Sequence, residues 1–282
     1  MKTGMFRSFF RFVLLAGSLP VAAQKVDYAK VKAPVLEERL HRAVDKTSDR
    51  EQTLHELFED AGCKEEALDE QRVKGSRTPN VVCTLKGSEE ARVVVGAHYD
   101  KVANGHGVID NWTGASLLPS LYQGLRDKPR RVTFVFIGFT DEEKWLVGSR
   151  YYVSRLTEED KAKIRAMVNL DSLGLSDTKV WLTRADKNLA SAAAAVAHSL
   201  NLPLAAVNVD RVGESDSRPF VHAKIPVIDF HSVTQETFPI LHSTRDGFPA
   251  VHLQEYENSY YFLVAYLAYL DVRLGASPQT PP

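Results

Sequence analysis

Acidic and histidine residues recur just after the apolar runs of this chain of 282 residues. The runs at 93–97, 132–139 and 166–170 contain no charged residue, as is typical of strands buried on both faces. If they are parallel strands of one sheet, their carboxyl ends meet at one edge, where open α/β sheets bind ligands. The residues expected there are His98, Asp100, Asp110, Glu142, Glu143, Asp171 and, after a fourth run at 227–230, His242.

These residue types together indicate metal chemistry. A single aspartate after a strand is most often a turn former or a helix cap. Several carboxylates buried together, however, are costly unless cations neutralise them. Mixed imidazole and carboxylate ligation suits zinc. The joint pattern therefore predicts a zinc site at this edge of the sheet.

Helical patterns separate the apolar runs, which predicts the elements that position these side chains. Helices are expected at 114–126, 146–156, 188–200, 217–223 and 253–274. Strands that alternate with helices predict a three-layer α/β fold, with helices flanking a mixed, mostly parallel central sheet. Upstream we expect a helical region at 34–61 and an antiparallel edge formed by strands near 67–73 and 80–85.

Composition sets the class of the protein. Hydrophobic residues make up 44% of the chain and charged residues 25%, as in an ordinary globular domain, which we place at 24–276. The formal net charge of -1 argues against nucleic-acid binding, which needs a basic face. A basic cluster at Lys128, Arg130 and Arg131 falls in a predicted turn and is expected to be solvated.

The first 23 residues have the pattern of a signal peptide. Lys2, Arg7 and Arg11 precede a short apolar run at 12–19, and small residues follow it. Cleavage would make Gln24 the first residue of the mature protein, while an uncleaved membrane anchor is the alternative. No other stretch looks transmembrane, so we expect a periplasmic or secreted protein without a stable membrane span. Residues 277–282 are expected to form a disordered tail.

The two cysteines, Cys63 and Cys83, can be interpreted in two ways. Export to an oxidising compartment favours a structural disulfide between them. Free buried thiols are the alternative. Neither cysteine has a histidine near it in the sequence, so we do not expect either to be catalytic.

The order of the motifs resembles one known family. VVVGAHYDKV, GVIDNWTGASLL, FVFIGFTDEEKWLVGSRYYV, MVNLDSLG, SDSRPF and LHSTRD resemble, in that order, motifs of the co-catalytic two-zinc aminopeptidases of the bacterial leucyl aminopeptidase type. Relatives of this family include the glutaminyl cyclases, the glutamate carboxypeptidases and the transferrin-receptor ectodomain. The resemblance covers about 92–270 and implies a zinc-exopeptidase-like fold.

The resemblance also implies roles for individual residues. His98 and Asp171 would hold one Zn²⁺, Glu143 and His242 a second, and Asp110 would bridge the two. Such a pair of metals can lower the pKa of a water molecule that attacks the peptide bond.

Three further residues match positions near the reaction. Glu142 would be the general base that takes the proton of that water. Asp100 would orient the imidazole of His98. Asp216 would contact the free amino group of a peptide substrate, or would simply be an acidic residue at a helix N-terminus. The implied reaction is removal of N-terminal residues from peptides that have a free N-terminus.

The chain departs from the family pattern at three positions. Ser217 stands where histidine is frequent, and Leu241 where an aromatic residue is common. Trp145 replaces a small residue; we expect it to pack in the interior, although it could instead line a substrate pocket.

Other functions remain possible from the sequence. A glutaminyl cyclase would form N-terminal pyroglutamate with a single zinc. A non-catalytic binding domain would need none of the ligands. A serine hydrolase is disfavoured because the chain has no Gly-x-Ser-x-Gly motif.

Overall fold

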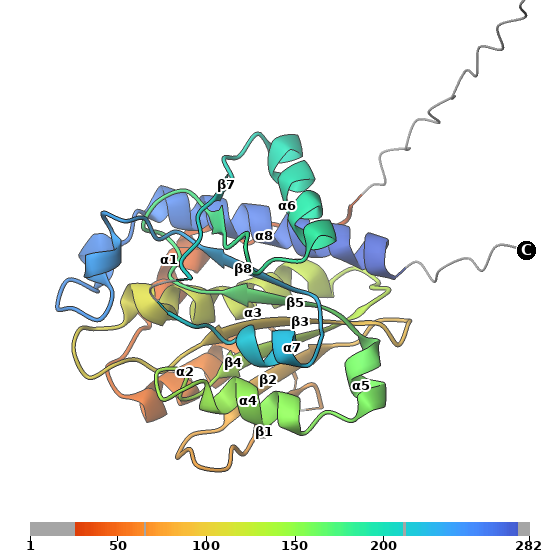
Figure 1. Ribbon diagram of the computed structural model, residues 1–282, viewed down its shortest axis with the longest axis horizontal. Helices are drawn as coiled ribbons and strands as arrows, with labels where there is room; N and C mark the ends of the chain where they lie inside the picture. Colours follow the sequence, from red (N-terminus) through yellow and green to blue (C-terminus); the bar gives the residue numbers. More distant parts are fainter. Residues whose placement is uncertain (1–25, 65, 211–212, 276–282) are drawn as a thin grey trace, which may run out of the picture.

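A central β-sheet runs through the middle of the molecule (Figure 1). The computed structural model describes residues 26–64, 66–210 and 213–275, and within these ranges the sheet has eight strands in the order β1-β2-β4-β3-β5-β8-β6-β7. The strands are β1 (Leu68–Gln71), β2 (Asn80–Leu85), β3 (Arg92–His98), β4 (Thr133–Phe139), β5 (Ile164–Leu170), β6 (Lys179–Val180), β7 (Ala205–Ala206) and β8 (Val227–His231).

The four strands at the centre are parallel, as predicted. Strand β3 pairs in parallel with β4 and β5, and β5 pairs in parallel with β8. His98 therefore lies opposite Phe139, and Leu170 lies opposite Phe230, so that the carboxyl ends of these strands meet at one edge. Strands β1 and β2 form the predicted antiparallel edge. Strands β6 and β7 were not predicted, because two residues are too short to show a pattern.

Helices cover both faces of the sheet, which confirms the predicted three layers (Figure 1). The apolar residues of α1, α2, α3, α6 and α8 share one core with Val93 and Val95 of β3. Residues from α4 and α7 share the opposite core with Val94. The helices are α1 (Ala33–His41), α2 (Thr47–Asp60), α3 (Thr113–Arg126), α4 (Val147–Ser154), α5 (Glu158–Lys163), α6 (Lys187–Leu200), α7 (Arg218–His222) and α8 (Leu253–Leu274).

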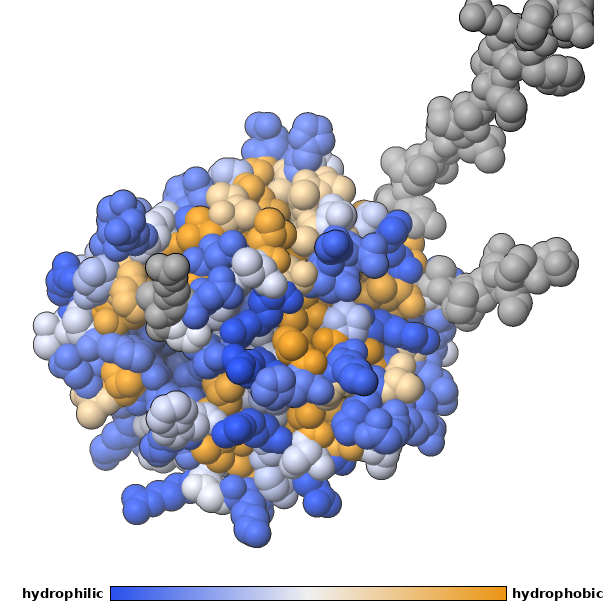
Figure 2. All heavy atoms as spheres, in the orientation of Figure 1, coloured by the Kyte–Doolittle hydropathy of each residue, from blue (hydrophilic) through white to orange (hydrophobic). Residues whose placement is uncertain are grey.

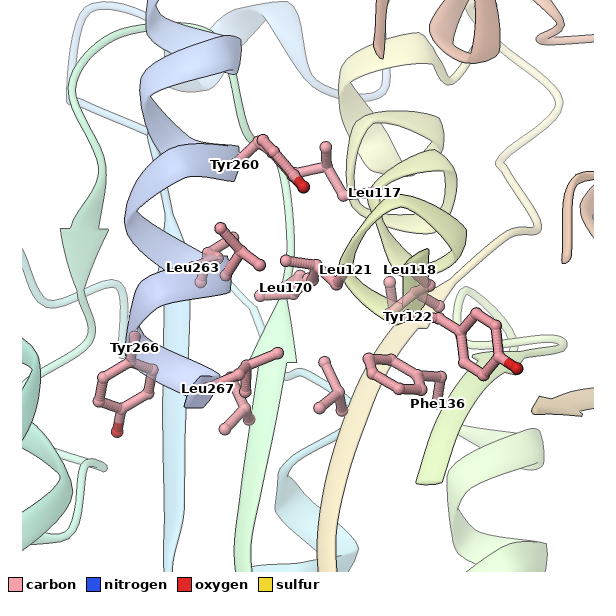
Figure 3. Close-up of a cluster of buried hydrophobic side chains, with 14 of the residues drawn as sticks. Leu117, Leu118, Leu121, Tyr122, Phe136, Leu170, Tyr260, Leu263, Tyr266 and Leu267 are labelled. Carbon is pink, nitrogen blue, oxygen red and sulfur yellow. The ribbon is translucent and has the colours of Figure 1, made fainter. Parts of the chain in front are cut away.

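The larger core lies between α3, α8 and the sheet. Figure 3 shows Leu263 and Leu267 of α8 facing Leu121 of α3, with Leu170 of β5 beside them. All four side chains are at most 1% exposed. This packing fixes the start of α3 close to the end of β5, and both points belong to the predicted site.

The helical region predicted at 34–61 is two helices. Helix α1 ends before Arg42, and α2 begins at Thr47 after extended backbone at Lys46. Between them the Val44 carbonyl accepts a hydrogen bond of 2.6 Å from Nε of Arg50. Helix α5 was not predicted because none of its residues is buried, so it shows no apolar period; a capping box between Thr157 and Asp160 begins it.

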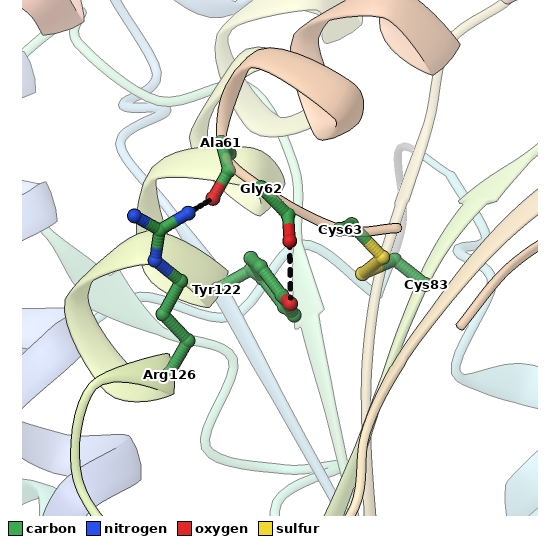
Figure 4. The surroundings of a disulfide bond; sticks show 6 residues. All are labelled: Ala61, Gly62, Cys63, Cys83, Tyr122 and Arg126. Carbon is green, nitrogen blue, oxygen red and sulfur yellow. Dashed lines mark hydrogen bonds between the residues drawn. A yellow bond between two sulfur atoms is a disulfide. The ribbon is translucent and has the colours of Figure 1, made fainter. Parts of the chain in front are cut away.

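A disulfide joins the end of α2 to β2. Cys63 and Cys83 are bonded, which confirms the favoured interpretation of the two cysteines (Figure 4). Next to it, the Tyr122 hydroxyl of α3 donates a hydrogen bond of 3.2 Å to the carbonyl of Gly62. The crosslink and this contact hold the N-terminal helical segment against the sheet.

The basic turn before β4 is only partly solvated, so the expectation for it was wrong at Arg130. Arg130 is 6% exposed, because its guanidinium donates to the carbonyls of Leu125 and Asp27 and lies 3.6 Å from a carboxylate oxygen of Asp271. The other oxygen of Asp271 accepts hydrogen bonds from the backbone of Arg131 and Val132. Both ends of the described chain thus lie at this turn.

The predicted signal peptide at 1–23 and the predicted tail at 277–282 lie outside the described residues. Within residues 26–64, 66–210 and 213–275, no helix has the length and apolar character needed to cross a membrane.

Candidate metal centre

Three of the predicted residues form a first group at the end of β3 and β5. Nε2 of His98 lies 3.2 Å from Oδ1 of Asp110 and 3.9 Å from Oδ1 of Asp171. His98 is the last residue of β3, and Asp171 directly follows β5. One ligand atom from each residue falls within 4.8 Å of the others, which is close enough for one ion.

A second group shares Asp110. Nε2 of His242 lies 3.1 Å from Oδ2 of Asp110 and 3.1 Å from Oε1 of Glu143. These three residues also have ligand atoms within 4.8 Å of one another. Asp110 therefore points one carboxylate oxygen at each group, which is the arrangement that a bridging ligand needs.

Asn111 fixes the segment that carries Asp110. This segment, η1 (Val108–Trp112), precedes α3, and its Asp110–Asn111 peptide bond is cis. The Asn111 side chain donates to the Leu170 carbonyl at 2.8 Å. Its Oδ1 accepts hydrogen bonds from the backbone of Gly114 and Ser172. The amide thus joins the start of α3 to the end of β5, where Asp171 lies.

Two residues that we did not predict support the same segment. Oδ1 of Asp246 accepts a hydrogen bond of 2.7 Å from the backbone N–H of Ile109, and Oδ2 accepts one of 3.3 Å from Asp110. Arg50 of α2 is fully buried and donates to the carbonyls of Tyr99, His106 and Gly107 at 3.3, 2.5 and 3.0 Å. These three carbonyls belong to the connection between His98 and Asp110.

A feature of the sequence could have identified each of these two supporting residues. Arg50 occupies the apolar face of α2 with Leu54, Leu57 and Phe58, where a cation needs internal partners. Asp246 closes the LHSTRD motif that also contains His242.

Asp100 connects the histidine of the first group to the loop that carries both glutamates. Its Oδ1 accepts a hydrogen bond of 3.0 Å from the backbone N–H of Glu142 and lies 3.4 Å from Nδ1 of His98. Its Oδ2 accepts one of 3.3 Å from the backbone N–H of Glu143. Asp100 is 2% exposed, so these contacts are shielded from water.

The loop after β4 has an unusual backbone. Asp141, Trp145 and Leu146 adopt positive φ angles of 51°, 72° and 60°, a region that non-glycine residues rarely enter. The loop turns Glu143 toward His242 and buries Leu146, but it leaves the side chain of Trp145 84% exposed. The expectation that Trp145 packs in the interior was therefore wrong, and this residue lines the cavity instead.

The electrostatics of the site show an excess of buried negative charge. Burial raises the pKa of Asp171 to about 7. Burial also raises the pKa of Glu142 well above its ordinary value, and the charges of Asp216 and Asp171 add to this shift. The carboxylates of Asp110 and Glu143 raise the pKa of His242 to about 10. Each of these shifts would be relieved by a cation.

Asp216 lies close to the site but is closed off from the cavity. It is 1% exposed, and both carboxylate oxygens lack a hydrogen-bond partner among the described residues. Burial raises its pKa to about 7. Its neighbours Ser215 and Ser217 donate hydrogen bonds of 2.6 and 2.8 Å to Asp229. The structure therefore does not bring Asp216 to the surface that a substrate amine would meet.

A cavity of about 960 Å³ opens over the two groups. Its walls include the five possible metal ligands and Glu142, together with apolar residues from several loops. This volume is at the upper end of the range that small-molecule sites occupy. The apolar part of the wall includes Trp145, Leu146, Val153, Pro219, Phe230, Val233, Phe238 and Leu241.

Comparison with known proteins places the chain in a family. The model of "Peptidase family M28" matches residues 80–267. An aminopeptidase of Pseudomonas aeruginosa is 39% identical over 104 residues, which are 36% of this chain and 19% of that protein. The alignment spans 19% of this relative, 35% of a leupeptin-inactivating enzyme of Streptomyces exfoliatus and 43% of an aminopeptidase of Bacillus subtilis, so the chain spans less than half the length of each.

Solved structures resemble the fold. A zinc aminopeptidase from Bacillus subtilis superimposes with a TM-score of 0.62 at 25% identity, covering 67% of this chain and 49% of that one. A glutaminyl cyclase from an Acidobacteriales bacterium superimposes with a TM-score of 0.74 at 15% identity, covering 91% of this chain and all of that one. Because the family model matches about two thirds of the sequence and the fold agrees, the chain belongs to peptidase family M28.

Proposed function

We propose that this chain is a zinc-dependent aminopeptidase that removes N-terminal residues from peptides. The observation that carries the proposal is the position of Asp110, whose two carboxylate oxygens face two separate groups of possible ligands. His98 and Asp171 would complete the site of one zinc. Glu143 and His242 would complete the site of the other.

The donor set fits zinc. Each group offers one imidazole nitrogen and two carboxylates, the ligand types that zinc takes in catalytic sites that keep a position open for water. The buried carboxylates also lack enough cationic partners of their own, as the raised pKa values of Asp171 and Glu142 indicate. Two bound zinc ions would supply Lewis acidity, acidifying a water molecule and polarising the scissile carbonyl.

Glu142 is the proposed general base. Its backbone is held by Asp100, and its carboxyl group lines the cavity beside the ligand groups. Glu142 belongs to neither group of possible ligands, so its carboxylate stays available to accept a proton. Glu142 would take the proton of the attacking water and pass it to the leaving amine. Asp100 would hold the ring of His98 in place through Nδ1.

We also propose that the protein works in an oxidising compartment. The disulfide between Cys63 and Cys83 supports this, because such bonds persist mainly in exported proteins. The signal-peptide pattern at 1–23 agrees with export to the periplasm or beyond the cell.

Metal content and activity test the function together. We expect purified protein from Gln24 onward to hold two zinc ions per chain by plasma mass spectrometry. It should release the first residue from leucine p-nitroanilide until a chelator is added, and recover with zinc. One zinc per chain together with ammonia release from glutaminyl peptides would assign the chain to the cyclases instead. A protein that binds no metal would contradict both the aminopeptidase and the cyclase function and would favour a non-catalytic binding domain.

The variant Glu142→Gln tests the mechanism. We expect it to keep two zinc ions and to lose at least about 100-fold in kcat, the lower end of what general-base catalysis contributes. Near-normal turnover in this variant would refute the assignment of Glu142 as the base.

A further inference from the structure

One wall of the cavity, formed by α4 and α7, is basic because it carries two arginines. Arg150 of α4 and Arg218 and His222 of α7 line it. Glu214 also lines the cavity, but its carboxylate is shared between Arg218 and Arg184, so that it neutralises only part of this charge. Figure 2 shows hydrophilic residues over α4 and α7 with apolar groups exposed between them.

This basic wall lies away from the acidic ligand groups. Helix α4 starts directly after the loop that carries Glu143 and runs away from it. Leu146, the residue just before α4, and Arg150 and Val153 of the helix all line the cavity. A helix rises 1.5 Å per residue, so Arg150 lies about 6 Å further along the wall than Leu146. Along this wall Leu146 therefore lies between the loop that carries Glu143 and Arg150, and Val153 lies beyond Arg150.

Arg150 is the cation best placed to meet a ligand. Its side chain is exposed and forms no ion pair with another described residue. Within the described part of the chain, its side chain donates one hydrogen bond, of 3.4 Å, from Nη1 to the carbonyl of Trp145. Arg218, by contrast, is already bonded to Glu214 and donates to Nε2 of His222. A guanidinium free of protein carboxylates can bind a substrate carboxylate in a bidentate manner.

We propose that the basic wall, centred on Arg150, binds a carboxylate of the substrate, so that the preferred substrates are short peptides with a negative charge one or two residues after the scissile bond. This inference rests on the proposed aminopeptidase function. The amino group of such a peptide would lie at the ligand groups, and its carboxylate would lie at Arg150. The carboxylate could be the C-terminus of a dipeptide or tripeptide, or an acidic side chain.

Substrates that differ only in the position of a carboxylate can distinguish the C-terminus from an acidic side chain as the group that binds Arg150. We would measure kcat/KM of the zinc-loaded enzyme for leucyl-alanine, leucyl-alanine amide, leucyl-aspartate amide and leucine p-nitroanilide. We expect leucyl-alanine to exceed its amide by about 10-fold, the factor that one charge-assisted hydrogen bond supplies. Recovery of the preference by leucyl-aspartate amide would identify an acidic side chain as the ligand, and its absence would identify the C-terminus.

Variants at Arg150 test the residue itself. In Arg150→Gln the ratio between leucyl-alanine and its amide should fall about 5-fold or more, while Arg150→Lys, which keeps the charge but not the paired donors, should give an intermediate ratio. Arg155→Gln is the matched control, because Arg155 is an exposed arginine at the end of the same helix and makes the same change of charge outside the cavity. The ratio in Arg155→Gln should equal that of the unmodified enzyme.

Two outcomes would overturn the inference. One is equal kcat/KM for all three peptides, and the other is an unchanged ratio in Arg150→Gln. A complete lack of hydrolysis, of the anilide as well, would refute the proposed function instead. In that case, calorimetric titration of Glu142→Gln with leucyl-alanine and its amide still tests the basic wall, since equal Kd values would refute it and a Kd ratio of about 10 would support it.

Discussion

At the scale of single residues, each carboxylate oxygen of Asp110 faces a separate ligand group, so a substitution in one group should leave the zinc site of the other group in place. Glu143→Ala removes one ligand from the group that contains His242 and leaves the group of His98 and Asp171 intact. We therefore expect this variant to retain about one zinc per chain by plasma mass spectrometry.

The matched control for this prediction is the neighbouring Glu142→Gln, which should retain both ions. If Glu143→Ala also held two zinc ions, Glu143 would not be a ligand, and the roles of the two adjacent glutamates would have to be exchanged.

Residues of the site differ in how far the sequence could predict them. His98, Asp171 and the two glutamates follow apolar runs, so the parallel sheet alone brings them together. Asp110 and His242 lie in irregular segments, so the apolar runs indicated only the edge of the sheet at which they fall, and the resemblance between motifs implied their roles. The exposure of Trp145 could not be predicted, because it depends on the positive φ angles of the loop, which its sequence does not indicate.

At the scale of elements, α2 is part of the site through Arg50. The guanidinium donates to carbonyls on both sides of the connection between β3 and η1, and burial lowers its pKa to about 10, so it stays charged at neutral pH. Arg50→Met would leave these buried carbonyls without a donor, at a cost of about 1–3 kcal/mol for each unsatisfied group.

We expect Arg50→Met to lower the melting temperature by roughly 6–12 °C in differential scanning calorimetry, taking about 3 kcal/mol in total and 2–4 °C per kcal/mol for a domain of this size. Arg50→Lys keeps the charge but offers fewer fixed donors. Its melting temperature should therefore lie between those of Arg50→Met and the unmodified protein. A shift of less than about 1 °C in Arg50→Met would show that the carbonyls find other partners.

The elements that were predicted well share one property. The central strands are continuous apolar runs, and α8 is long and periodic, so local pattern and burial agree. The break between α1 and α2 was missed because apolar residues at roughly helical spacing continue across it, at Leu40, Val44 and Leu54. Helix α5 was missed because a surface helix with a capping box needs no apolar face.

At the scale of the whole molecule, the buried charges make stability depend on pH when metal is absent. Asp171 and Asp216 have a pKa of about 7 in the folded protein, above their ordinary value, and His242 has a pKa of about 10. In each case the folded state binds more protons than the unfolded state, so stability is lost as pH rises through the folded pKa. His231 acts in the opposite direction, since burial lowers its pKa to about 4, but its contribution is constant above about pH 6.5.

We therefore expect the melting temperature of the chelated protein to fall between pH 6.5 and pH 9. The melting temperature of the zinc-loaded protein should fall much less over this range, because the metal ions replace the protons that the site loses. Scanning calorimetry of both forms over this range measures the difference. Parallel curves for the two forms would contradict the idea that the metal ions neutralise this cluster.

The turn before β4 has a practical consequence. Asp27 and Asp271 both bind Arg130 there, at the amino ends of the parallel strands, whereas the cavity opens at their carboxyl ends. Both ends of the described chain therefore emerge on the side opposite the cavity (Figure 1). A fusion partner, an affinity handle or a solid support attached at either end would leave the mouth of the cavity facing the solution, so that the immobilised protein would still meet dissolved peptides.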